Sequence, residues 1–195
     1  PGDVVVASGV CQGWRPWLAQ PLALDYIPGV GPDSWPGLMF PIGVSHPPWE
    51  ALTLSLNDKV PHMFISGGPE SGVTEALATL IGSALRRYAP SDCAFVVIDD
   101  DGRLADVAGL ANVAGYARTN NDDAVERMLG EALRINAVRR ARFAADGLSS
   151  FDEYAESKGD GDPYGRLIVV VAGLEGVLDA HPAAMEKLLT DPSPV

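Results

Sequence analysis

The sequence lacks the features that mark membrane-spanning and nucleic-acid-binding proteins. No apolar run approaches the roughly 20 residues that a membrane-spanning helix needs. Basic residues are scarce, since 14 lysines and arginines stand against 26 aspartates and glutamates, for a net charge of −12 at pH 7. A broad nucleic-acid surface needs clustered lysine and arginine. The charge therefore argues against such a surface and favours neutral or basic protein partners.

Cysteine and histidine are scarce as well. Cys11 and Cys93 lie far apart in the sequence and form no metal-binding or redox motif, which is typical of idle thiols in a reducing compartment. The histidines are scattered, and none stands near Asp and Ser or Cys in a catalytic pattern. They are His46, His62 and His181. We expect structural roles for them and no metal site.

What remains is the composition of one globular domain. A chain of 195 residues with 47% hydrophobic and 21% charged residues is long enough to bury a sizeable core. Pro1 stands where a methionine would begin the chain, and no signal peptide follows it, so we expect a fragment of a longer protein.

Residues 1–50 are rich in proline, glycine and tryptophan and cannot be mostly helical. We expect them to wrap around a domain formed by residues 51–195, with short extended pieces such as Val4–Val6 and Leu38–Val44. The tryptophans of this segment either pack against the domain and hold the segment to it, or they form a binding face. They are Trp14, Trp17, Trp35 and Trp49.

From residue 51 onward, strand-like and helix-like patterns alternate. Leucines at every second position over residues 52–56 predict a half-buried strand, and continuous apolar runs predict strands that helices cover on both faces. These runs are Met63–Ser66, Ala94–Ile98 and Leu167–Val171. Helical spacing predicts helices over residues 77–88, 121–145 and 180–189. The alternation predicts a three-layer α/β domain with a mostly parallel sheet.

Two polar features have simple interpretations. The cations Arg139, Arg140 and Arg142 are expected in the last turns of the long helix, where they suit the helix dipole. Asp160 and Asp162 flank a glycine as in a cation-binding loop, but the ligand count is too small, so we expect a solvated turn.

Residues 62–74, HMFISGGPESGVT, contain most of a phosphate-binding loop. They match G-x-x-x-x-G-K-[ST] between a predicted strand and a predicted helix, except that Val73 replaces the lysine that normally reaches the β- and γ-phosphates. The candidate nucleotide-binding residues are Gly67, Gly68, Pro69, Glu70, Ser71, Gly72, Val73 and Thr74. Backbone amides and the Thr74 hydroxyl would still suit phosphate and Mg²⁺, whereas Glu70 opposes an anion. Weak binding of ATP and Mg²⁺ therefore stays open, but we expect no hydrolysis.

A working ATPase site also needs an acid at the end of a neighbouring strand. The strand 94–98 is followed by Asp99, Asp100 and Asp101, which satisfy this requirement locally but are equally typical of a solvated turn. The strand 167–171 is followed by Ala172 and Gly173, without an acid. On the local pattern alone, the first strand is the stronger candidate.

Several motifs occur together in one order. They are Pro41-Ile42-Gly43, the loop Gly67–Thr74, Tyr88-Ala89-Pro90, the segment Phe143–Tyr154 and Asp162-Pro163-Tyr164-Gly165. In this order they resemble the FtsK/SpoIIIE-type ATPase domains of the EccC motor of type VII (ESX) secretion. The resemblance covers roughly residues 20–190. It implies a P-loop NTPase fold of the RecA/FtsK-like kind, several such domains in tandem, and a further strand with basic residues after Val195.

The resemblance also places the Walker B acid at Ala172, next to Gly173. Both catalytic positions are then lost, because Val73 replaces the lysine and Ala172 replaces the acid. It implies a degenerate, non-hydrolysing domain on the cytoplasmic side of a membrane-anchored complex, attached to the membrane only through the rest of the motor. The implied partners are other ATPase domains of the motor and secreted helical, WXG100-like substrates, not nucleic acid.

Three hypotheses follow. The first is a docking and regulatory module without catalysis. The second is a weak ATPase in which Asp99 or Asp100 replaces the lost acid. The third is a relative of the DNA translocases, which the acidic charge disfavours.

Overall fold

The computed structural model describes residues 37–44, 51–68, 70–157 and 162–190. Their elements are, in chain order, β1 (Leu38–Val44), β2 (Ala51–Leu56), α1 (Val73–Leu85), β3 (Cys93–Asp99), the 3₁₀ helix η3 (Ala105–Gly109), β4 (Val113–Arg118), α2 (Asp122–Asp146), α3 (Phe151–Ser157), β5 (Arg166–Val171), α4 (Leu174–Ala180) and α5 (Pro182–Thr190). Val4–Val6 and the four tryptophans lie outside the described residues.

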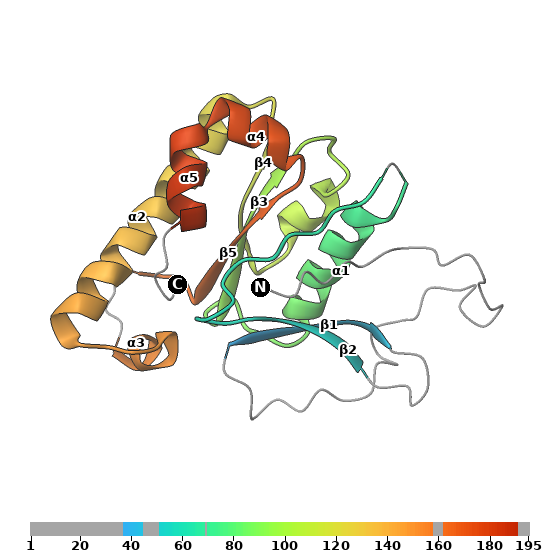
Figure 1. The fold of residues 1–195 in the computed structure, drawn as a ribbon. Helices are drawn as coiled ribbons and strands as arrows, with labels where there is room; N and C mark the ends of the chain where they lie inside the picture. The colour runs from blue at the N-terminus through green and yellow to red at the C-terminus, as the bar shows by residue number, and fades with distance from the viewer. Residues whose placement is uncertain (1–36, 45–50, 69, 158–161, 191–195) are drawn as a thin grey trace.

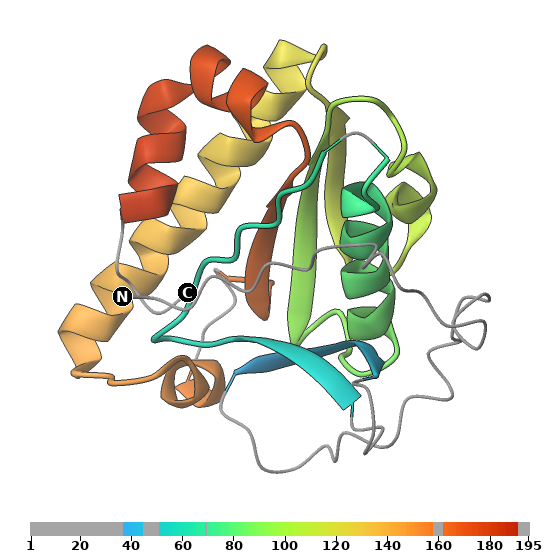
Figure 2. The same cartoon turned by 45° about the vertical axis from the view of Figure 1, so that its right-hand side comes forward.

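The predicted three-layer α/β architecture is confirmed. A parallel sheet of order β4-β3-β5 forms the middle layer. Helix α1 and η3 cover one face of it, and α2, α4 and α5 cover the other (Figures 1 and 2). All residues of the central strand β3 are buried, as the unbroken apolar run at 94–98 predicted for a strand covered on both faces.

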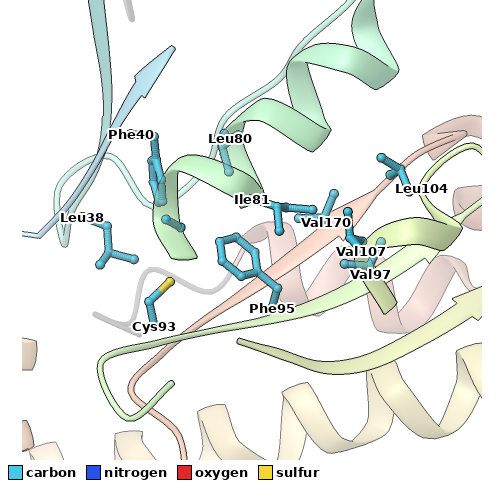
Figure 3. Close-up of a cluster of buried hydrophobic side chains, with 11 residues drawn as sticks. Leu38, Phe40, Leu80, Ile81, Cys93, Phe95, Val97, Leu104, Val107 and Val170 are labelled. Carbon is cyan, nitrogen blue, oxygen red and sulfur yellow. The ribbon is translucent and has the colours of Figure 1, made fainter. Parts of the chain in front are cut away.

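Each face of the sheet has its own hydrophobic core. On the α1 face, Phe95 and Val97 of β3 pack with Ile81 of α1 and with Phe40 of β1 (Figure 3). On the other face, Ile98 packs with a cluster from α2, α4 and α5. Cys93 belongs to the first core, and burial raises the pKa of its thiol to about 12.

Strands β1 and β2 form a separate antiparallel hairpin with an irregular register between Pro41 and Gly43. The hairpin packs against the first core through Leu38 and Phe40. It matches the strands expected at 38–44 and 52–56, and it spans the proposed boundary at residue 50.

The long helix also agrees with its sequence signals. The Asn121 side chain accepts a hydrogen bond from the Ala124 amide at 3.3 Å, and Gly147 ends the helix with φ 66°. Val125, Leu129 and Ala132 are buried on its inner face.

The prediction for Met63–Ser66 is wrong. Residues 61–68 have no regular secondary structure, because no strand lies beside them to complete a ladder of hydrogen bonds. The C-terminal helix also differs, since α4 and α5 are two helices separated at His181. Helix α1 ends at Leu85, before Tyr88 and Pro90. Strand β4 and η3 were not predicted, because β4 is short and lacks a continuous apolar run.

The predictions for Arg139 and Asp162 are wrong too. Both side chains are almost fully buried, and their ion pair joins Nε of Arg139 to Oδ2 of Asp162 at 2.6 Å. Arg139 also donates to the Gly165 carbonyl at 2.6 Å, and the Tyr154 hydroxyl donates to Asp162 at 2.9 Å. The Arg139 guanidinium therefore links α2 to α3 and to the start of β5. Arg140 and Arg142 are exposed, but α2 continues to Asp146 and its last turn contains no basic residue, so the expected role at the helix dipole is wrong for these arginines as well. Asp160 lies outside the described residues.

Two backbone segments pack closely at Gly165, immediately before β5. A Cβ there would collide with the backbone of Ser91 and Asp92. We expect Gly165→Ala to lower the free energy of unfolding by about 1–3 kcal/mol, because the backbone must shift. Gly130, on the open side of α2, is the matched control. Gly130→Ala is expected to raise stability by up to about 1 kcal/mol through helix propensity. Urea titration measures both, and equal effects would contradict the packing argument.

Candidate functional site

The loop at 67–74 connects the extended residues 61–68 to the start of α1. Gly72 has φ 88° and precedes the helix without a side-chain cap, so the first-turn amides stay available. Glu70 has φ 61°, a left-handed conformation that is uncommon for a non-glycine residue. Pro69 lies outside the described residues. This is the backbone context of a phosphate-binding loop.

The loop packs on itself. A Cβ on Gly67 would collide with the Ser71 hydroxyl and would lie 3.0 Å from Cγ2 of Val73. The Ser71 amide donates to the Gly68 carbonyl at 3.1 Å, and the Ser71 hydroxyl oxygen is buried without a hydrogen-bond partner. Loop side chains therefore crowd the Gly67 backbone, where an anion cradle needs open space.

Acidic groups dominate the surroundings of the loop. Arg103 is bound to the Glu75 carboxylate and lies 3.9 Å from that of Asp101, so its charge is already neutralised. Among the described residues that line the adjoining groove, the only lysine or arginine is Arg166. Arg166 is paired with Asp58 at 2.7 Å and with Asp152 at 3.2 Å. Among the described residues that line the groove, no unpaired lysine or arginine therefore substitutes for the lysine that Val73 replaces.

Ala172 and Gly173 lie directly after β5, at the same end of the sheet as the loop. The Ala172 amide donates to the Ile98 carbonyl at 2.8 Å, which continues the pairing with β3. Val73, Thr74, Ala172 and Gly173 line one groove. The two segments that the sequence analysis assigned to one site therefore lie along the same groove.

The aspartates at the end of β3 have different roles. Asp99 is fully buried, and its Oδ2 accepts hydrogen bonds from the Leu104 amide at 2.9 Å and the Tyr116 hydroxyl at 2.7 Å. Desolvation and this hydrogen bond raise the pKa of Tyr116 to about 12. Asp99 therefore holds η3 and β4 in place and is not positioned as a substitute acid.

Asp100 lies at the site itself. It accepts a hydrogen bond from the Thr119 hydroxyl at 2.8 Å, and a Cβ on Gly173 would lie 3.1 Å from Oδ2 of Asp100. No sequence signal separates Asp100 from Asp99, because the difference depends on how β3 ends against β5. Its carboxylate adds negative charge to the groove that Thr74 also lines, where a nucleotide's phosphates would need positive charge.

These residues do not make a fit site for Mg²⁺-ATP. Val73 stands at the lysine position of the motif, Ala172 and not an acid follows β5, loop side chains crowd Gly67, and several carboxylates lie near the loop. Within the described ranges, no group of three or more His, Cys, Asp or Glu side chains is arranged to hold a metal ion. The described helices include none with the length and apolarity to cross a membrane.

Comparison with known proteins decides the family. The sequence model of the FtsK/SpoIIIE family matches residues 34–190. The chain belongs to the FtsK/SpoIIIE family. It is 25% identical over 180 residues to the ESX-1 secretion system protein EccCb1 of Mycobacterium tuberculosis, covering 87% of this chain and 30% of the relative. It is 28% identical over 173 residues to EccC3 of the ESX-3 system of the same organism, covering 85% and 12%.

Solved structures agree on the fold. Thermomonospora curvata EccC (ATPases 2 and 3), in complex with a signal sequence peptide, matches with a TM-score of 0.70 and 24% identity. The match covers 87% of this chain and 35% of that one. The cytoplasmic domain of EssC matches with a TM-score of 0.65 and 19% identity over 77% of this chain and 29% of that one. The predicted fold class and the resemblance to EccC are confirmed, and this FtsK/SpoIIIE chain spans about a third or less of each of these relatives.

Proposed function

We propose that this chain is a degenerate, non-hydrolysing ATPase domain of a type VII secretion motor, which docks and regulates neighbouring ATPase domains or recruits secreted helical substrates. One observation carries the proposal. Val73, at the lysine position of the motif, and Ala172, which the resemblance aligns with the catalytic acid, line the same groove, which supports a joint loss in one site. Each lost charge group normally contributes several kcal/mol to transition-state stabilisation.

The partners proposed for this domain are proteins. The net charge of −12 and the carboxylates around the loop suit neutral or basic protein surfaces and oppose nucleic acid. The homologous EccC proteins belong to ESX secretion systems, and one neighbouring structure is the cytoplasmic domain of a type VII secretion ATPase. This supports a place on the cytoplasmic side, with membrane attachment through the rest of the motor.

Substrate recruitment is supported by a relative and by exposed apolar side chains. The neighbouring EccC structure contains a signal sequence peptide. In this chain, Leu52 within β2 and Val60 shortly after β2 are 47% and 53% exposed. We expect binding to neighbouring motor domains or substrate tails to survive Thr74→Ala and to fall at least tenfold in Leu52→Glu or Val60→Glu. Pull-down with the cognate motor and substrates tests this, and robust binding to duplex DNA instead would favour a translocase.

Titration calorimetry with Mg²⁺-ATP tests the degenerate site. We expect no saturable heat at nucleotide concentrations up to about 1 mM, which corresponds to a binding free energy weaker than about −4 kcal/mol. The matched control is Val73→Asp, which adds a further negative charge to the loop. Micromolar binding by the wild type that Val73→Asp abolishes would overturn the proposal.

A second candidate function is a weak ATPase that uses Asp100. The observation that favours it is the Asp100 carboxylate against Gly173, beside the position of the lost acid. In that case Asp100→Asn would abolish magnesium-dependent phosphate release, whereas Asp101→Asn would leave it within about twofold.

A further inference from the structure

The backbone of the loop at 67–74 closes on itself. The Ser71 amide donates a hydrogen bond to the Gly68 carbonyl at 3.1 Å. Glu70 precedes Ser71 with φ 61°, a left-handed conformation that suits a chain reversing its direction over four residues. In a phosphate-binding loop, backbone amides of this kind point at the anion. Here the Ser71 amide already has an acceptor within the loop.

The Ser71 side chain covers Gly67. A glycine in a phosphate-binding loop leaves space in which an anion can approach the backbone. At Gly67, a Cβ would collide with the Ser71 hydroxyl and would lie 2.8 Å from the Ser71 Cβ. Cγ2 of Val73 lies 3.0 Å from the same position. The space that glycine leaves open is therefore filled by two side chains of the loop itself.

The Ser71 hydroxyl gains no hydrogen bond in this position. Its oxygen is buried and has no hydrogen-bond partner among the described residues. Buried polar atoms without a partner are rare in folded proteins, and each one lowers stability. The closed turn and the packing on Gly67 therefore determine where this hydroxyl lies, and a hydrogen bond does not.

The start of α1 is held in place as well. Glu75 in its first turn is bound to Arg103, which lies 3.9 Å from the Asp101 carboxylate after β3. A carboxylate in the first turn also complements the positive end of the helix dipole, which otherwise favours an external anion. The first turn of α1 thus carries a negative charge of its own and is tied to the segment that follows β3.

We propose that the loop is held shut by an autoinhibitory contact, in which the Ser71 side chain packs on Gly67 and blocks the phosphate cradle. This block differs from the loss of the lysine, because it removes space and a backbone donor, whereas Val73 removes a charge. The inference rests on the proposed function and deepens it, since a domain that hydrolyses no nucleotide keeps the loop as a closed turn leading into α1. Restoring the lysine then adds charge to a cradle that stays filled.

Binding of inorganic pyrophosphate tests the contact. Pyrophosphate has the charged phosphates of a nucleotide without its base, so its affinity reports on the loop. Titration calorimetry compares Val73→Lys with the double variant Val73→Lys/Ser71→Gly, which lacks the side chain on Gly67. We expect the double variant to bind pyrophosphate at least about tenfold more tightly, or roughly 1.4 kcal/mol. Ser66→Gly in the same Val73→Lys background is the matched control. Ser66 is exposed and also adjoins Gly67, so this change should leave the affinity within about twofold.

Hydrogen exchange of the wild-type chain tests the contact without a substitution. We expect the Ser71 amide to exchange at least about tenfold more slowly than in an unfolded peptide, because it is bonded within the closed turn. An excess of pyrophosphate should leave this rate unchanged.

Either of two results would overturn the autoinhibitory contact. The first is equal pyrophosphate affinity of Val73→Lys with and without Ser71→Gly. The second is a Ser71 amide that exchanges at the unfolded rate in the wild type. Neither measurement involves ATP, whereas phosphate release from ATP by the wild type would contradict the proposed function.

Discussion

Replacing Asp162 by alanine is expected to lower the free energy of unfolding by about 3–5 kcal/mol, because it leaves the Arg139 charge buried without its partner. Arg139 has no exposed side-chain surface, and it also contacts carbonyl oxygens and the rings of Phe151 and Tyr154. Neither kind of partner carries a full negative charge. Chemical denaturation of the wild type and the variant measures the loss.

The matched control is an exposed ion pair on the same helix. Arg142 and Asp146 lie 2.6 Å apart with side chains 51% and 36% exposed. Asp146→Ala is expected to change stability by less than about 0.5 kcal/mol, because water screens the pair. If Asp162→Ala lowers the free energy of unfolding no more than Asp146→Ala does, the buried ion pair does not stabilise the fold.

The same ion pair gives a dependence on pH. Burial alone would raise the pKa of Asp162, but the hydrogen bond and charge of Arg139 outweigh it and hold the pKa below the ordinary value of 3.8. The folded state therefore binds this proton less tightly than the unfolded state. The stabilisation is fully present above about pH 4 and is lost as the pH falls through the lowered pKa. Acid titration of Asp162→Asn should lack this component.

Restoring the lysine alone is expected to strengthen nucleotide binding without giving turnover. Val73→Lys supplies a charge that attracts phosphate in the ground state, whereas the metal and attacking water still lack an acid at position 172. Nearby carboxylates, including Glu70 and Asp100, should keep the gain within about tenfold, or roughly 1.4 kcal/mol. Calorimetry and phosphate release on the same preparation measure the two effects separately.

The control for this variant is Val73→Met, which adds length without charge. Equal nucleotide affinities of the two variants would show that the lysine charge does not contribute to nucleotide binding. Turnover by Val73→Lys alone would mean that Asp100 or another acid acts in place of the one lost at position 172, which favours the second candidate function.

The sequence predicted the covered strands and the long helix because their signals are local. Each signal determines the structure of residues close to it in the sequence. Examples are the apolar run at 94–98, the cap at Asn121 and the glycine at 147. The strand at 63–66 was predicted on equally good local grounds, yet it fails to form. A strand needs a neighbour, and whether one is present is not encoded in the strand's own residues.

Arg139 and Asp162 show the same limit for charges. Both stand in polar sequence that predicts exposure, and only the packing of α3 and the start of β5 around them makes them buried partners. The position of Asp100 against Gly173 also depends on a contact between distant segments. The loop at 67–74 was recognisable because its motif is contiguous, whereas the way in which Ser71 and Val73 crowd Gly67 was not.

The central claim is that the site formed by the loop and the end of β5 performs no catalysis. Magnesium-dependent phosphate release from ATP by the purified chain, measured beside the Val73→Asp variant, tests it most directly. The two proteins are expected to release phosphate at the same background rate. Release by the wild type at several times the rate of Val73→Asp, abolished by removal of magnesium, would contradict the account.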